Sequence, residues 1–201
     1  MTFDEAVAFA LPIATELRHE MHRNPELSGK EEQTARRIQA ILEAHGIAVV
    51  SGLGGMHGLM CTIEGLPGSS CWGIRADMDA LPIQEVSDAP YVSQVPGVMH
   101  ACGHDGHTTI LLGTAKYLMQ NRNFNGTAIL IFQPAEEGGR GALAMVEDGM
   151  MERFDIAEIY GMHNMPGLPA GHLGFRDGPR RRGLRTRRPS PPSCPTECPA
   201  R

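Results

Sequence analysis

The N-terminal part of the chain shows the hydrophobic spacing of two amphipathic helices. Over residues 4–23, apolar side chains recur every three or four positions, at Val7, Leu11, Ala14, Leu17 and Met21. Pro12 lies inside this pattern and should kink or interrupt the helix, because proline donates no backbone hydrogen bond and its ring crowds the preceding turn. A second helix is predicted over residues 30–45, with Ser28 as its cap and Gly46 as its end.

After Gly46 the apolar residues form short runs bounded by glycine and proline, which is typical of strands. The glycine-rich segment 52–58 lacks the third glycine of a nucleotide-binding loop and precedes a strand, so it predicts a hairpin turn. Further helices are predicted over 106–120 and 141–148. The predicted strands are 47–50, 58–63, 72–76, 128–132, 156–160 and a final 172–175, of which 128–132 and 156–160 should be buried.

This alternation of helices and strands predicts an α/β fold, a layered helix–sheet–helix domain with a mostly parallel central sheet. A length of 201 residues with 41% hydrophobic residues gives room for one good-sized core. The domain is expected to span residues 1–178. In parallel sheets, functional residues collect at the carboxyl ends of the strands.

Residues 179–201 differ in composition from the rest of the chain. They contain six prolines, seven arginines and one acid, Glu197, and therefore carry a net charge of +6. Because the whole chain has a net charge of −5, residues 1–178 carry −11. A segment with the composition of 179–201 buries too little apolar surface to offset the entropy of ordering, and we predict a disordered, dispensable tail. An out-of-frame origin is favoured over a basic tail that binds anions or nucleic acid.

The acidic body predicts no nucleic-acid partner, because it has no basic stripe that would neutralise phosphates. No apolar run in the sequence approaches the ~18 residues of a membrane span, so no membrane partner is expected. The N-terminus lacks the features of a secretory signal, so a cytoplasmic location with reduced cysteines is expected. Cys61 and Cys71 lie in apolar runs and should be core residues.

The segment 99–107 concentrates metal-binding side chains, with three histidines, one cysteine and one aspartate in nine residues. Thiolate, imidazole and carboxylate together suit zinc, manganese, cobalt or iron better than calcium or magnesium. Three more polar clusters follow predicted strands, which favours one shared site with Cys102 and His104. These clusters are Asp77 with Asp79, Glu136 with Glu137, and His163.

Two adjacent carboxylates can take different roles in the metal-assisted hydrolysis of an amide. Glu136 and Glu137 cannot both enter one ligand shell along an extended backbone, so one can bind metal while the other accepts a proton from a metal-activated water. The same pair could instead be a solvated loop, and His163 a strand-end histidine without a ligand role. Asp77 and Asp79 could be ligands, orienting partners of a histidine, or turn residues.

Five motifs in series resemble those of metal-dependent amidohydrolases, the group that contains hippurate hydrolases, N-acyl-amino-acid amidohydrolases and auxin-conjugate hydrolases. They are HRNPELS (22–28), RADMDALP (75–82), HACGHDGH (100–107), QPAEEG (133–138) and GMHN (161–164). The resemblance implies hydrolysis of N-acyl amino acids at two divalent metal ions, Mn²⁺ or Zn²⁺, with Co²⁺ or Ni²⁺ as alternatives. It implies Cys102 as a bridging ligand, Glu136 as general acid/base and Asp79 as a supporting carboxylate. His104, Glu137 and His163 are then the further metal ligands.

Members of the resembled family are longer, with an inserted lid and dimerisation domain and a further histidine ligand that this sequence does not match. The resemblance therefore implies an incomplete catalytic domain, little activity of this chain alone, and no homodimer of the family's type. Two alternatives stay open: a non-catalytic metal-binding fragment, and a hydrolase that uses Cys102 as nucleophile. Sensitivity to chelators would separate a metal enzyme from a thiol enzyme.

Overall fold

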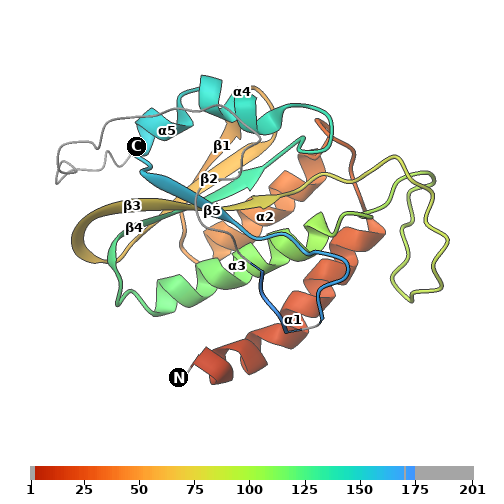
Figure 1. Cartoon of the computed structure of the whole chain (residues 1–201), viewed down its shortest axis with the longest axis horizontal. Coiled ribbons are helices and arrows are strands. Elements are labelled where there is room, and N and C mark those ends of the chain that lie inside the picture. Colours follow the sequence, from red (N-terminus) through yellow and green to blue (C-terminus); the bar gives the residue numbers. More distant parts are fainter. Residues whose placement is uncertain (1–2, 170, 175–201) are drawn as a thin grey trace.

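The computed structural model describes residues 3–169 and 171–174 and shows a sheet between two layers of helices (Figure 1). Helices α1, α2 and α3 cover one face, and the short helices α4 and α5 cover the other (Figure 1). The predicted α/β class is therefore confirmed. In chain order the elements are α1 (Phe3–Arg23), α2 (Glu32–Ala44), β1 (Val49–Leu53), β2 (Gly58–Glu64), β3 (Leu66–Asp77), α3 (His104–Gln120), β4 (Asn125–Gln133), α4 (Gly141–Glu147), α5 (Met150–Arg153) and β5 (Glu158–Gly161).

The five-stranded sheet is mixed, in the order β1-β2-β4-β3-β5. The pairs β1/β2 and β2/β4 are antiparallel, whereas β3 pairs in parallel with both β4 and β5. The connection from β3 to β4 runs through α3 on one face, and the return to β5 runs through α4 and α5 on the other. The parallel half therefore places the carboxyl ends of β3, β4 and β5 at one edge of the sheet.

Strand β4 is apolar on both faces because it separates two cores. Leu130 and Phe132 pack under α2 and α3, while Ile129 and Ile131 pack under α4 and α5. All four side chains are at most 1% exposed. A continuous apolar run is what burial on both faces requires, so the predicted buried strand is confirmed here.

Two local predictions at the N-terminus need correction. Helix α1 continues through Pro12, so the predicted interruption is wrong, while the alternative of a kink stays a prediction. Ser28 does not cap α2, because its hydroxyl donates instead to Asp79 Oδ2 at 2.6 Å. The Glu26 carboxylate takes that role and accepts the backbone N–H groups of Gln33 and Thr34 at 3.1 and 2.7 Å.

The last strand also differs from its prediction. Among the described strands β5 lies at the edge of the sheet and pairs with β3 alone, and all four of its residues are exposed. Ile156, just before it, is the residue that enters a core. Residues 172–174 form no strand, and Phe175 and the segment 179–201 lie outside the described residues.

The segment 52–58 forms the turn between β1 and β2, as predicted, and Cys61 and Cys71 are buried core residues. Among the helices that the structure describes, none is long and apolar enough to cross a bilayer.

Candidate metal centre

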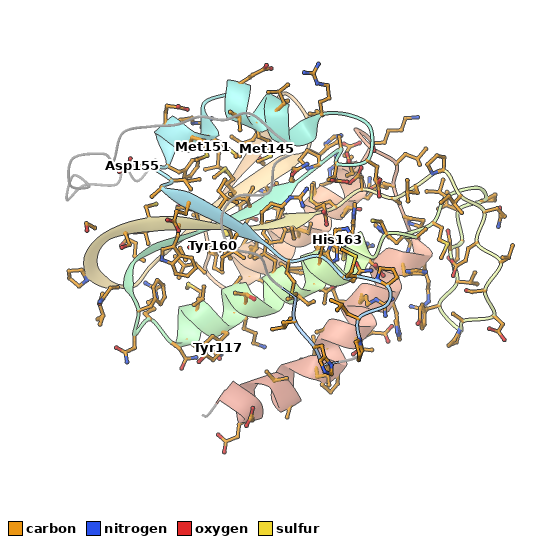
Figure 2. All side chains as sticks on the ribbon, viewed as in Figure 1. Tyr117, Met145, Met151, Asp155, Tyr160 and His163 are labelled. Carbon is orange, nitrogen blue, oxygen red and sulfur yellow. The ribbon has the colours of Figure 1, made fainter. Side chains whose placement is uncertain are left out.

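The polar side chains that follow β3, β4 and β5 meet the loop that precedes α3. Cys102 Sγ lies 3.3 Å from His163 Nε2, although 61 residues separate them in sequence. One ligand atom each from Cys102, His104 and Glu137 lie within 4.8 Å of one another. Figure 2 shows His163 beside the first turn of α3. Four of the five residues predicted to converge, all except Glu136, thus lie together in the structure, and their role as metal ligands stays a prediction.

His104 presents a bare nitrogen to this site. Its Nδ1 faces two acceptors, the carbonyl oxygen of Asp79 at 2.8 Å and Asp79 Oδ1 at 3.2 Å, and therefore carries the proton. Its Nε2 is buried without a hydrogen-bond partner and lies 3.6 Å from Asp77 Oδ2 and 3.8 Å from Glu137 Oε1. Burial alone would lower the pKa of His104, but the hydrogen bond with Asp79 and the charges of Asp77, Asp79 and Glu137 outweigh burial and raise it. A buried ring nitrogen without a partner among carboxylates is a setting that fits binding of a cation.

His163 is held in the same tautomer. Its Nδ1 donates to the carbonyl oxygen of Asn164 at 2.6 Å, which leaves Nε2 free to face the Cys102 thiol. An acceptor on one ring nitrogen commonly fixes the other nitrogen as a metal ligand. His104 and His163 therefore both offer Nε2 toward Cys102.

Asp79 organises the site from beneath. Its Oδ2 accepts the Ser28 hydroxyl and the backbone N–H of Glu137 at 2.9 Å, while its Oδ1 holds His104. Burial alone would raise the pKa of this carboxyl, but the hydrogen bonds from His104, Ser28 and the backbone outweigh burial and lower the pKa to about 2. Asp79 is thus an anion that orients one candidate ligand and the backbone of another.

Asp77 and His107 form a second pair at the rim of the cluster. His107 Nδ1 lies 2.6 Å from Asp77 Oδ1, and Arg75 donates to Asp77 Oδ2 at 2.7 Å. His107 Nε2 lies 2.6 Å from Asn164 Oδ1 and 3.1 Å from the backbone nitrogen of Asn164. Through these contacts His107 holds the segment that carries His163, and one ligand atom each from Asp77, His104, His107 and His163 also lie within 4.8 Å of one another.

Gly103 is required where the ligand loop enters α3. Its φ of 86° lies in the left-handed region. A Cβ at this position would also lie 2.7 Å from Asn164 Oδ1. Any other side chain would strain the backbone here and would displace the Asn164 side chain, beside the candidate ligand His163.

Cys102 lies among carboxylates. Its burial is the largest cause that raises the pKa of its thiol, and the charges of Glu137, Asp77 and Glu136 add to it, so that the pKa is about 12. A thiol in this setting is protonated at neutral pH, whereas a cation beside it would favour the thiolate. Glu136 and Glu137 are both exposed.

Glu31 is a site residue that sequence reasoning missed. This carboxylate is fully buried, and its Oε1 accepts the backbone N–H of Ala135 at 2.7 Å. Ala135 has a positive φ of 49°, unusual outside glycine, directly before Glu136 and Glu137. Glu31 therefore fixes the turn that orients Glu136 and Glu137. No signal in the sequence indicated this role, because the charged residues around Glu31 resemble an ordinary solvated start of a helix.

Comparison with known proteins places the chain in a family. Residues 73–197 match the family described as Peptidase family M20/M25/M40. The chain belongs to this family. Its match reaches beyond residue 178 into the arginine- and proline-rich segment.

The relatives that the chain resembles include proteins named as hydrolases and deacetylases. The chain is 49% identical over 150 residues to the hippurate hydrolase of Campylobacter jejuni, covering 75% of this chain and 39% of that protein. It is 43% identical to an N-acetylcysteine deacetylase of Bacillus subtilis, covering 81% of this chain and 43% of the relative. The chain thus spans less than half the length of these relatives.

The same likeness holds in three dimensions. A Bacillus subtilis structure described as a dinuclear metal-binding peptidase of the M20 family superposes with a TM-score of 0.79 and 41% identity. The match covers 84% of this chain and 47% of that one. Together with the bare His104 nitrogen, this likeness supports divalent metal binding at the cluster.

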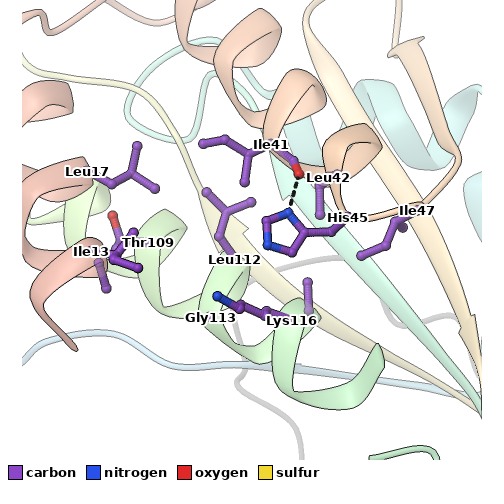
Figure 3. Close-up of a pocket in the computed structure, with 12 residues that line it drawn as sticks. Ile13, Leu17, Ile41, Leu42, His45, Ile47, Thr109, Leu112, Gly113 and Lys116 are labelled. Atoms are coloured by element: carbon purple, nitrogen blue, oxygen red, sulfur yellow. Dashed lines mark hydrogen bonds between the residues drawn. The ribbon is translucent and has the colours of Figure 1, made fainter. Parts of the chain in front are cut away.

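An apolar cavity of about 200 Å³ lies away from this cluster, between α1, α2 and α3 (Figure 3). Its walls include Leu17, Ile41 and Leu112, and the His45 ring at its edge donates to the Ile41 carbonyl at 2.9 Å. None of the candidate ligands lines it. The cavity therefore adds nothing to the metal centre.

The buried carboxylates predict acid-sensitive stability. Asp77, Asp79, Glu85 and Asp105 all have pKa values below their ordinary ones, because hydrogen bonds and charges from histidine, arginine and serine partners outweigh burial. Their stabilisation is present above the unfolded values of about 4 and is lost as the pH falls through the lower folded values. Melting with a chelator present should show a falling Tm from about pH 5 to about pH 2. An unchanged Tm across that window would contradict the ionised cluster.

Proposed function

We propose that this chain carries the metal-binding part of an amidohydrolase that cleaves N-acyl amino acids. The observation that carries the proposal is the buried, unpartnered Nε2 of His104 facing a thiol and a carboxylate. Cys102, His104, Glu137 and His163 are the side chains that would hold divalent metal. Relatives named for hydrolysis of hippurate and deacetylation of N-acetylcysteine support this substrate class.

Bound metal supplies electrophilic polarisation of the amide carbonyl and makes water a better nucleophile at neutral pH. Glu136 accepts the proton of the attacking water and returns it to the leaving amine nitrogen. Glu136 is exposed, which suits contact with substrate. Asp79 keeps His104 and the Glu137 backbone in place during that transfer.

A cysteine nucleophile is the second candidate. Against it, burial and then the carboxylates around Cys102 raise the pKa of its thiol to about 12. A nucleophilic cysteine needs a depressed pKa and an adjacent cation or base. The negative surroundings favour a cation at this position. A metal-binding chain without catalysis is the third candidate, and the activity experiment in the Discussion separates it from the first.

Cobalt binding to the 201-residue chain tests the metal site directly. The expected result is saturable Co²⁺ binding with a thiolate-to-cobalt charge-transfer band, and loss of that band in Cys102→Ser. Cys71→Ser is the control for the loss of a thiol, because Cys71 is buried in the core under α5 and belongs to neither group of candidate ligands. Absence of binding, or a band that survives in Cys102→Ser, would overturn the proposed ligand set.

A further inference from the structure

A second buried charged cluster lies on the other side of the first turn of α3. His22 Nδ1 lies 2.9 Å from Asp105 Oδ2, and His22 Nε2 lies 3.3 Å from Glu85 Oε1. The three residues are 5%, 0% and 7% exposed. None of them belongs to the proposed ligand set.

The imidazole of His22 is an imidazolium in this arrangement. Both of its ring nitrogens face carboxylate oxygens, which only accept hydrogen bonds when ionised. The hydrogen bond to Asp105 is the largest cause that raises the pKa of His22, and it outweighs the burial that would lower it. One buried cation thus joins two buried anions.

These contacts connect three segments that are distant in sequence. His22 is in the last turn of α1, Asp105 is in the first turn of α3, and Glu85 belongs to the loop 82–98 between them. Arg18, one turn before His22, adds a hydrogen bond to Asp105 at 3.1 Å. The end of α1 therefore holds the start of α3, whose first residue is His104.

Glu85 also organises the loop 82–98 from inside. Its carboxylate accepts the backbone N–H of Ser93 at 2.7 Å and the hydroxyl of Ser87 at 2.5 Å. Leu81 and Met99 close the base of the loop with two backbone hydrogen bonds of 3.0 Å. The loop begins shortly after Asp79 and ends shortly before Cys102, so fixing the loop fixes the two segments that carry them.

Stability alone gives a poor account of such a cluster. Buried ion pairs are often no more stabilising than apolar side chains of similar volume, because removing the charges from water is costly. The charged groups instead fix the relative orientation of the segments, because each hydrogen bond is directional and joins one segment to another. That property matters where ligand atoms must converge within a few tenths of an ångström.

We infer that His22 is a positioning residue for the metal centre, linking Glu85 of the loop and Asp105 of α3 so that the ligand-bearing segments converge. This inference rests on the proposed metal-binding function. Outer partners that orient metal ligands typically change metal affinity by about 10–100-fold when they are removed. A comparable loss is expected when the His22 link is broken.

The experiment compares the 201-residue chain with His22→Gln and Glu85→Gln, measuring thermal melts and Co²⁺ titrations. We expect both variants to bind Co²⁺ at least about tenfold more weakly, with a weaker thiolate-to-cobalt band. Met150→Ala is the control matched for stability, because it opens the core under α5 away from the site. It should lower Tm and leave Co²⁺ affinity unchanged.

The outcomes separate this inference from the proposed function. If the unsubstituted chain binds no Co²⁺, the metal site itself fails and the inference falls with it. If that chain binds Co²⁺ and the folded variants bind it equally well with the same band, only the inference is overturned. Glu85→Gln decides the matter if His22→Gln does not fold, since it keeps the side chain's size and one acceptor oxygen.

Discussion

Glu136→Gln should nearly abolish amide hydrolysis while metal binding is retained. Glutamine matches glutamate in size but cannot accept a proton from water and return it to the leaving nitrogen. General acid/base groups contribute about 10²–10⁴-fold to the rate, so kcat should fall by at least that range. Because Glu136 is exposed and makes none of the close contacts of the ligand set, the fold and the bound metal should be little affected.

The activity measurement needs the remainder of a family member, since the chain spans 43% of the N-acetylcysteine deacetylase it matches. A chimera in which this chain replaces the matching part of that relative provides it. The unsubstituted chimera should hydrolyse an N-acyl amino acid. A chelator should inhibit this activity strongly, and a thiol-alkylating reagent should inhibit it less. Metal binding by this chain together with an inactive chimera would favour the non-catalytic candidate.

Glu137→Gln is the matched comparison at the neighbouring position. Its carboxylate lies with Cys102 and His104 in the ligand cluster, and a neutral amide is a poorer ligand. This variant should lose metal first and activity as a consequence, so that added metal partly restores the rate. Equal metal content and equal activity in the two glutamine variants would refute the division of roles.

The layered fold and the position of the site were predictable from sequence because both depend on local patterns. The apolar run of β4 reports burial on two faces, and the polar residues after β3, β4 and β5 fall at one edge once those strands are parallel. The grouping of Cys102 with His163 follows from the same rule.

Contacts between distant segments left no such local signal. Glu31 reaches Ala135 across 104 residues, and His22 reaches Asp105 across 83. Each looks in sequence like an ordinary polar residue near a helix end. The apolar residues of β5 predicted a buried strand. Sequence pattern does not reveal the position of a strand in the sheet, and β5 lies at the edge of the described sheet with all its residues exposed.

The sequence alone could not distinguish the three possible roles of Asp79. A ligand, an orienting partner and a turn residue all suit an acid after a strand. Its hydrogen bonds to His104, Ser28 and the Glu137 backbone identify an orienting partner. The expected consequence is that Asp79 sets metal affinity without touching the metal.

Asp79→Asn should weaken metal binding by about 10–100-fold, the usual effect of removing a partner that orients a ligand. An amide has one acceptor, whereas Asp79 uses both oxygens. If the amide NH₂ faces His104, it favours the tautomer that protonates Nε2 and blocks the lone pair. If the NH₂ faces the other way, it opposes the backbone N–H of Glu137.

Co²⁺ titration and thermal melting of the 201-residue chain measure this effect. Asp155→Asn is the matched control, because it removes the same charge beyond α5, at a positive φ of 49° that asparagine tolerates well. Ser28→Ala should have a smaller effect than Asp79→Asn, since it removes one of the donors to Oδ2 and leaves His104 held. A fully folded Asp79→Asn variant with unchanged Co²⁺ affinity would show that His104 needs no carboxylate to present its Nε2.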